Sequence, residues 1–213
     1  TPVLDYRFDE ESWNGTAGEL IDNSDSLLHG QSSGGTLSQG AQVCRGATFD
    51  GVDDYFILPP ISTDFSAGLS AMAWVDFNSA QYWERIFDFS NGQANDNILF
   101  ARNGTSNDLT FEIYNGGSSC GKTTASNGIQ SGRHHYAATL SPAGAVVLYR
   151  DGVAIESGTS SCQPANVTRS TNYIGRSAWA SDGYFDSRID ELKVFDSGLS
   201  ASNISDIYDE EFA

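Results

Sequence analysis

Positively charged side chains are scarce in this 213-residue chain, which has 11 Lys and Arg against 28 Asp and Glu and a formal net charge of −17. Nucleic-acid binding requires clustered cations that displace counterions from phosphates, and the sequence has no basic patch. Long apolar runs are also missing, since a stretch such as residues 145–149 is far shorter than the roughly 20 residues that cross a bilayer. We therefore expect no nucleic-acid partner and no membrane insertion.

Cysteine is rare too, with only Cys44, Cys120 and Cys162. Cys120 and Cys162 occur in matching contexts, because each follows two serines and a strand-like run and opens a polar loop. We predict a disulfide between them, with Cys44 left over; three reduced thiols are the alternative. An acidic, lysine-poor surface and a disulfide favour an extracellular, cell-surface or periplasmic location, with any signal peptide removed or lying upstream.

Glycine (22 residues), Ser, Thr and Asn are abundant, and this composition favours short strands joined by tight turns. Alternating apolar positions predict eleven strands, at residues 3–8, 54–58, 70–77, 85–89, 97–101, 109–114, 134–140, 145–150, 153–157, 171–175 and 188–195. Asp151-Gly152 predicts a two-residue hairpin turn, and Ser200 is placed to cap a short C-terminal helix over 201–208. Strands without crossover helices indicate an all-β, antiparallel two-sheet sandwich, and we expect residues 1–213 to form a single domain because no linker divides them.

Seven segments, which together span nearly the whole chain, carry a family pattern. They are Leu4-Asp5-Tyr6-Arg7-Phe8-Asp9-Glu10, Phe49-Asp50-Gly51-Val52-Asp53-Asp54-Tyr55, Ala73-Trp74-Val75, His134-His135-Tyr136-Ala137-Ala138-Thr139, Leu148-Tyr149-Arg150-Asp151-Gly152, Tyr173-Ile174-Gly175-Arg176 and Phe185-Asp186-Ser187-Arg188-Ile189-Asp190-Glu191-Leu192. In this order they resemble the bacterial laminin-G-like, or concanavalin A-like lectin/glucanase, jelly-roll domain. That resemblance implies a jelly-roll sandwich but does not fix a function, because folds of this kind serve lectins, hydrolases, lyases and spacers.

The first of these segments, together with Ser12-Trp13-Asn14-Gly15-Thr16-Ala17-Gly18-Glu19, is most similar to the version in proteins of mannose-sensitive haemagglutinin pilus biogenesis. That version would have a cysteine near Glu11 as the partner of Cys44, and this chain has none there. The narrower resemblance implies a module of a larger surface or pilus-associated protein.

The resemblance also implies one structural Ca²⁺, bound where the first strand, the loop after the second strand and the last strand meet. Carried over by position, Asp9 would supply a carboxylate, Gly51 a carbonyl oxygen and Asp190 a carboxylate. Oxygen ligands of these types suit Ca²⁺. The alternative is that Asp9 and Asp190 accept backbone hydrogen bonds in turns and at sheet edges.

The sequence lacks the patterns of enzymes with this fold. Glucanases of this type carry Glu, Asp and Glu alternating on one strand, whereas the nearest strand here offers only Glu112. Arg85, Arg102, His135 and Tyr136 could imitate the residues used by alginate lyases, but His135 and Tyr136 are adjacent in a strand and would face opposite surfaces. We predict that the protein is not an enzyme, with a polysaccharide lyase or a glycosidase as the weaker alternative.

Three turn-rich loops, at residues 81–85, 91–97 and 179–184, are rich in polar side chains, and the first and third also carry aromatic rings. Sugar sites have this composition, because rings stack on pyranose faces while polar groups bind hydroxyls. We predict a shallow rim groove in which Trp83, Trp179 or Tyr184 stacks on a sugar and Asn97, Arg102 and Asp182 form hydrogen bonds with it. Partial burial of Trp83 and Trp179 is the alternative.

These inferences predict a non-catalytic, extracellular carbohydrate-binding or adhesion module. Its expected partners are a glycan or cell-surface polysaccharide and, within a larger surface protein, other domains. The alternative is a structural or protein-interaction domain in pilus assembly that binds no sugar.

Overall fold

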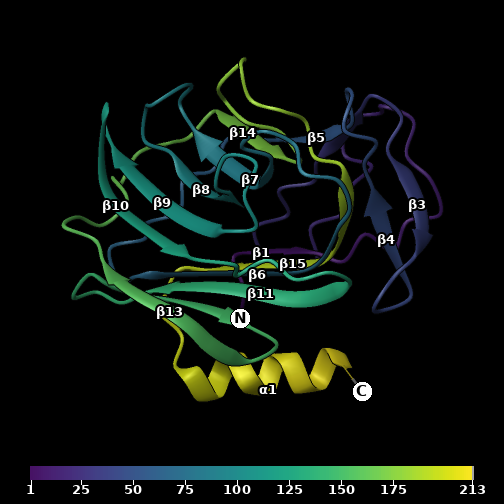
Figure 1. Ribbon diagram of the computed structural model, residues 1–213. Coiled ribbons are helices and arrows are strands. Elements are labelled where there is room, and N and C mark those ends of the chain that lie inside the picture. The colour runs from purple at the N-terminus through teal and green to yellow at the C-terminus, as the bar shows by residue number, and fades with distance from the viewer. Residues whose placement is uncertain (213) are drawn as a thin grey trace.

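In the computed structural model, which describes residues 1–212, alternating apolar runs form strands that are joined by loops and tight glycine turns. The strands pair into two antiparallel sheets that face each other, and helix α1 (Ala201–Phe212) lies against the outside of one sheet (Figure 1). This is the predicted fold class, an all-β two-sheet sandwich with a short C-terminal helix.

The two sheets differ in size. In spatial order, the eight-stranded sheet consists of β13 (Val153–Thr159), β12 (Ala145–Arg150), β11 (Arg133–Leu140), β6 (Leu69–Phe77), β15 (Ser187–Phe195), β4 (Arg45–Thr48) and β3 (Leu37–Gly40), with β1 (Leu4–Tyr6) paired to β15. The seven-stranded sheet consists of β10 (Ser118–Ala125), β9 (Leu109–Asn115), β8 (Ile98–Arg102), β7 (Arg85–Ser90), β14 (Thr171–Ile174), β5 (Tyr55–Leu58) and β2 (Gln31–Ser33).

All eleven predicted strands are present, and the structure adds β2, β3, β4 and β10. The added strands read QSS, LSQG, RGAT and SSCGKTTA, so they have too few apolar residues to show an alternating pattern. Their place in the sheets comes from backbone pairing with neighbours distant in sequence, as between β4 and β15. The predicted hairpin joins β12 to β13, where Asp151 and Gly152 both have the positive φ that the tight turn requires (51° and 75°).

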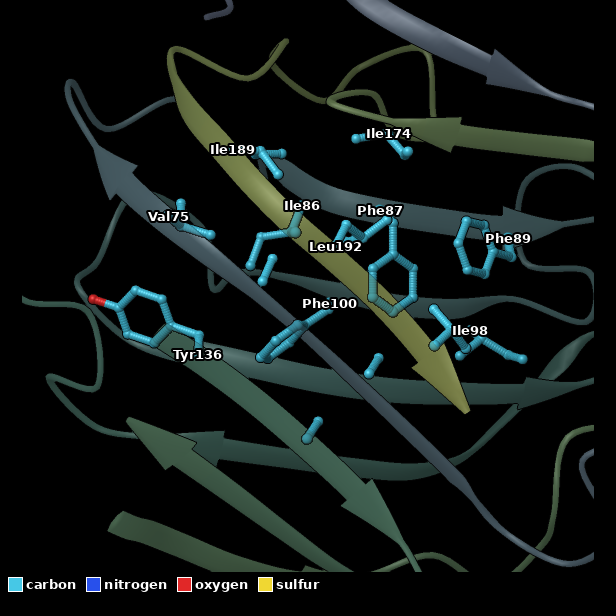
Figure 2. Close-up of a cluster of buried hydrophobic side chains, with 14 of the residues drawn as sticks. Val75, Ile86, Phe87, Phe89, Ile98, Phe100, Tyr136, Ile174, Ile189 and Leu192 are labelled. Carbon is cyan, nitrogen blue, oxygen red and sulfur yellow. The ribbon is translucent and has the colours of Figure 1, made fainter. Parts of the chain in front are cut away.

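The core lies between the two sheets and is rich in aromatic rings. Figure 2 shows side chains of β7 and β8, such as Phe87 and Phe100, close to Ile189 and Leu192 of the opposite sheet. The rings of Phe87 and Phe89 stack with centroids 4.5 Å apart. Each strand places one set of alternate residues in this core, so the other set is free to face outward.

Helix α1 covers the outer face of the eight-stranded sheet. Ser200 caps the helix by accepting a hydrogen bond from the backbone N–H of Asn203 (3.2 Å), as predicted, but the helix continues four residues beyond the expected end. Ile204 packs against Met72 and Phe195 in a second apolar cluster beneath the helix. No helix within residues 1–212 is long and apolar enough to cross a membrane. Helix α1 does not cover the outer face of the seven-stranded sheet (Figure 1).

The predicted disulfide joins Cys120 and Cys162, whose Cα atoms are 5.8 Å apart. It links β10, an edge strand of the seven-stranded sheet, to the segment that follows β13 of the other sheet. Cys44 is free and exposed. The disulfide therefore joins the two layers at the same edge of the sandwich.

Candidate functional site

A row of side chains crosses the outer face of the seven-stranded sheet. Direct cross-strand pairing places Tyr173 of β14, Asp88 of β7, Leu99 of β8, Glu112 of β9 and Lys122 of β10 side by side. Neighbouring strands are about 4.8 Å apart, so the row is roughly 19 Å long. It provides an outward-facing surface that contains both charges and aromatic rings.

The loop between β14 and β15 (residues 175–186) crosses this row at Asp88. The backbone N–H of Ala178 donates a hydrogen bond of 3.0 Å to Oδ2 of Asp88. Further along the loop, Oδ2 of Asp182 accepts hydrogen bonds from Arg85 (2.9 Å) and from the hydroxyl of Ser177 (2.7 Å). These contacts fasten the loop to the sheet and divide the outer face into two hollows.

The larger hollow, which we call the groove, has a volume of about 330 Å³. Its residues come from the β6–β7 loop, from strands β7 to β10 and from the β14–β15 loop: Tyr82, Trp83, Arg85, Leu99, Glu112, Tyr114, Lys122, Trp179, Ser181 and Asp182. The smaller one, the second hollow, has a volume of about 160 Å³ and contains Arg176 and Tyr184. Trp179 and Asp182 belong to both, so they form the wall between the two hollows.

The buried guanidinium of Arg85 holds the two indoles of the groove. Its central carbon lies 5.4 Å from the ring centroid of Trp83 and 5.5 Å from that of Trp179. The ring of Tyr114 lies 5.7 Å from that of Trp179. Cation–π contacts with a desolvated guanidinium are stronger than those at exposed sites, so the positions of the indoles are fixed before any ligand arrives.

Donors and acceptors lie side by side in the groove. Glu112 accepts a hydrogen bond from the hydroxyl of Ser119 (2.6 Å), and burial, together with the Glu112 carboxylate, raises the pKa of Tyr114. Lys122 is opposite Glu112 in the β9–β10 pairing, but its ammonium lies over the Trp83 ring, 4.6 Å from the centroid. The groove therefore presents carboxylate acceptors, cationic donors and aromatic faces together.

Of the six residues predicted to bind a sugar, three line the groove: Trp83, Trp179 and Asp182. Tyr184 lies across the loop in the second hollow. Asn97 and Arg102 reach neither hollow, which corrects the prediction for both.

The reason for the correction is that their polar groups are used inside the fold. Asn97 is fully buried and donates a hydrogen bond of 2.7 Å to Asp88. Arg102 is 2% exposed and pairs with Glu84 at 2.6 Å. Burial raises the pKa of Glu84 to about 7, although Arg102 acts in the opposite direction.

Sequence reasoning missed four groove residues, namely Leu99, Glu112, Tyr114 and Lys122. Tyr82, Arg85 and Ser181 lie in loops that the sequence indicated, but none of the three was predicted to contact the sugar. The alternation of Glu112 and Tyr114 with the core residues Phe111 and Ile113 was a usable signal, because it places both polar side chains on one outward face. Lys122 had no such signal, since β10 was not recognised as a strand.

Asp9 and Asp190, two of the predicted calcium ligands, lie close enough together to interact. Each carboxylate accepts a backbone N–H from the segment around Cys44, Asp9 from Arg45 (3.1 Å) and Asp190 from Val43 (2.8 Å). Burial, together with the carboxylates of Glu191 and Asp9, raises the pKa of Asp190 to about 7. Oδ1 of Asp190 is buried and has no hydrogen-bond partner within residues 1–212. This carboxylate oxygen is therefore available to bind a cation such as Ca²⁺.

Gly51 lies elsewhere, beside the residues that lead into β15. Its backbone N–H donates to the carbonyl of Phe185, five positions before Asp190 on the chain. It sits in a turn with Asp50, Asp53 and Asp54, each of which has one carboxylate oxygen within 4.8 Å of the others, so the three could hold a metal ion. The structure thus separates two candidate cation positions, one at Asp9 and Asp190 and one at this acidic turn.

Residues 50–205 match the family described as the concanavalin A-like lectin/glucanases superfamily. No match is found among the curated proteins. Among solved structures, domain 4 of AbnA, a GH43 extracellular arabinanase from Geobacillus stearothermophilus, in complex with arabinotriose, is 19% identical with a TM-score of 0.75, and the match covers 98% of each chain.

Receptor-binding fragments of clostridial toxins are also similar. A structure of botulinum neurotoxin type C, described as depending on two ganglioside molecules for cell entry, has a TM-score of 0.74 at 13% identity. The binding domain of botulinum neurotoxin DC in complex with SialylT has a TM-score of 0.73 at 12% identity. Each match covers 99% of this chain but only 51% of the toxin fragment. At these identities the likeness shows a shared fold.

Proposed function

The chain belongs to the concanavalin A-like lectin/glucanase superfamily, and from its groove we propose that it binds a glycan without cleaving it. The observation that carries the proposal is that the rings of Trp83 and Trp179 both lie against the Arg85 guanidinium. The same groove also contains polar side chains, among them Glu112, Lys122 and Asp182. Indole faces bury the apolar face of a pyranose ring, and polar groups at their edge bind its hydroxyls. The complex of the structurally similar AbnA domain with arabinotriose supports the same kind of ligand.

The bonding of the groove carboxylates supports a non-catalytic role. A glycosidase needs one carboxyl group free to donate a proton and a second free to attack or to activate water. Asp182 is engaged by Arg85 and Ser177, and Glu112 by Ser119. His135 is the only histidine among the residues that could imitate an alginate-lyase site. It lies under helix α1, on the opposite side of the sandwich from the groove.

The bound ion, the cellular location and the biological role that we propose for the domain rest on other features of the chain. We place a structural Ca²⁺ at Asp9 and Asp190, because Asp190 keeps one buried oxygen without a partner. The disulfide supports an extracellular or periplasmic location, where such bonds persist. Adhesion, as part of a larger surface or pilus-associated protein, is the role that we propose for this binding.

A glycan array followed by calorimetry with the best ligand tests the proposal. We expect a Kd between about 1 mM and 1 µM for one site. Trp179→Ala should weaken binding at least tenfold, whereas Trp179→Phe, which keeps an aromatic face, should retain most of it. Both variants should unfold near the parent's melting temperature, because Trp179 is only partly buried. If no glycan binds the parent protein, the alternative of a protein-interaction domain replaces this proposal.

A further inference from the structure

Two cations on the outer face of the seven-stranded sheet keep their hydrogen-bond donors free. Within residues 1–212, Arg176 forms no hydrogen bond and no ion pair, and its contacts are with aromatic rings. Lys122 is exposed and forms one long hydrogen bond, 3.4 Å to the side-chain oxygen of Asn103. By contrast, the buried Arg85 and Arg102 are neutralised by carboxylates. The protein has 28 acidic residues and a net charge of −17, yet within the described part of the chain none of these acids pairs with Lys122 or Arg176.

Three tyrosines hold the Arg176 guanidinium in place. Its central carbon lies 4.6 Å from the ring centroid of Tyr55, 4.8 Å from that of Tyr173 and 5.8 Å from that of Tyr184. The rings also pack on one another, with 5.6 Å between Tyr55 and Tyr173. A guanidinium held by its faces leaves its N–H edge available, and that planar fork matches the two oxygens of a carboxylate or sulfate.

Lys122 and the Arg176 cluster lie at the two ends of one continuous surface. Lys122 and Tyr173 are the end members of the cross-strand row, roughly 19 Å apart at the usual strand spacing. The β14–β15 loop crosses between them, and Trp179 and Asp182 border both hollows. A ligand that reached both cations would have to be a chain of several sugar units passing over this wall.

The carboxylates between the two ends are partly neutralised, because the Arg85 guanidinium lies among them. Asp182 and Asp88 both lie against Arg85, at 2.9 and 3.5 Å. Glu112 is the remaining carboxylate of the groove, and it is bonded to Ser119. More distant acids act through solvent, where the screening length is about 8 Å at physiological salt.

We infer that the glycan bound on this face is an anionic chain, bearing carboxylate or sulfate groups, and that Lys122 and Arg176 contact those groups. The inference rests on the proposed function, because it names the class of glycan. It assigns Arg176, Tyr55 and Tyr173 to binding and makes the second hollow a subsite of the groove.

The test is calorimetry of the full chain with heptagalacturonide, with the same oligomer fully methyl-esterified, and with a sulfated carrageenan oligomer. We expect the galacturonide or the carrageenan oligomer to bind at least tenfold more tightly than the ester, because hydrogen bonds between the cations and charged groups are stronger than those to neutral groups. Arg176→Gln and Lys122→Gln should each remove most of that advantage. Arg133→Gln, which changes an arginine on β11 of the other sheet, is the charge-matched control and should have no effect.

Equal binding of the acidic and esterified oligomers would overturn the inference and leave the proposed function intact. Tight binding of an acidic oligomer that survives both Arg176→Gln and Lys122→Gln would also overturn it. If none of the three probes binds, and the array identifies only neutral glycans, the inference fails alone. If the array identifies no glycan, both proposals fail together.

Discussion

The indole Nε1 of Trp74 donates a hydrogen bond of 2.8 Å to Oε2 of Glu211, which joins the middle of β6 to the last turn of helix α1. The other carboxylate oxygen of Glu211 accepts a hydrogen bond from Lys193 of β15. Tyr208 stacks on the Trp74 ring with centroids 5.5 Å apart. One residue of the helix therefore satisfies polar groups on two strands at once.

Replacing Glu211 should loosen the helix. Glu211→Ala leaves the indole N–H of Trp74 without an acceptor and removes one partner of Lys193, so we expect a loss of about 1–3 kcal/mol in the free energy of unfolding. Urea denaturation measures it. Asp206→Ala, at an exposed position of the same helix, is the control and should change stability by less than about 0.5 kcal/mol. Equal effects of the two variants would contradict the anchoring role of Glu211.

His135 should make the protein less stable in acid. It is fully buried beneath the helix, near Trp74, Tyr208 and Glu211, and neither ring nitrogen has a hydrogen-bond partner within residues 1–212. Burial, together with the Lys193 ammonium and against the effect of Asp151, lowers the pKa of His135 to about 4. An unfolded histidine has a pKa of about 6.5, so between pH 6.5 and 4 the unfolded chain takes up a proton that the folded chain does not.

The stability contributed by neutral His135 is therefore complete above about pH 6.5 and falls by about 3 kcal/mol as the pH drops to 4. Glu84, whose raised pKa acts in the opposite direction, contributes equally in the parent and in a His135→Gln variant. The difference in unfolding free energy between parent and variant should thus shrink with falling pH across this window. A difference independent of pH would show that His135 does not titrate as described.

Calcium should stabilise the protein through Asp190. A ligand that binds only the folded state adds about 2.7 kcal/mol at a hundred times its Kd, so the melting temperature should rise with Ca²⁺ and fall with EDTA. Asp190→Asn should abolish that response, because it changes the carboxylate that holds the unpartnered Oδ1. Asp53→Asn probes the acidic turn instead and should preserve the response. The reverse pattern would move the ion to the turn, and no response in the parent would remove it altogether.

Arg102 should be needed for folding and not for binding. Arg102→Met leaves Glu84 buried without its cation, and breaking a buried pair in this way costs about 3–5 kcal/mol. The double variant Glu84→Gln/Arg102→Met should recover most of this loss, since it removes the uncompensated carboxylate. Glycan affinity, measured well below the melting temperature, should stay unchanged in both. A large loss of affinity in a folded Arg102→Met protein would restore the original sugar-binding prediction.

The sequence predicts a strand or turn well where the signal, such as apolar alternation or a turn dipeptide, lies within one short segment. Alternation and the Asp151-Gly152 turn locate the β12–β13 hairpin, because both signals lie within one short segment. The polar strand β4 gives no such signal, since its place is set by pairing with β15, about 140 residues further along the chain.

The same limit explains the candidate site. Trp83, Trp179 and Asp182 were predicted because loops that mix aromatic and polar residues are recognisable by composition alone. Nothing in the sequence indicates that Arg102 is neutralised by Glu84 or that Asn97 bonds to Asp88, since these partners meet only when β7 and β8 pair. Sequence identifies the residue types of a binding site, whereas the sheet register decides which of them remain available.

The β14–β15 loop has a consequence for how this protein can change over time. It contributes Arg176 to one hollow and Ser181 to the other, and Trp179 and Asp182 to both, while its ends are ordinary strand connections. Substitutions confined to this short connection would alter what the surface recognises without disturbing the packed interior. Descendants of such a sequence can therefore acquire new preferences within a dozen codons, and relatives with nearly superimposable backbones need not share a ligand.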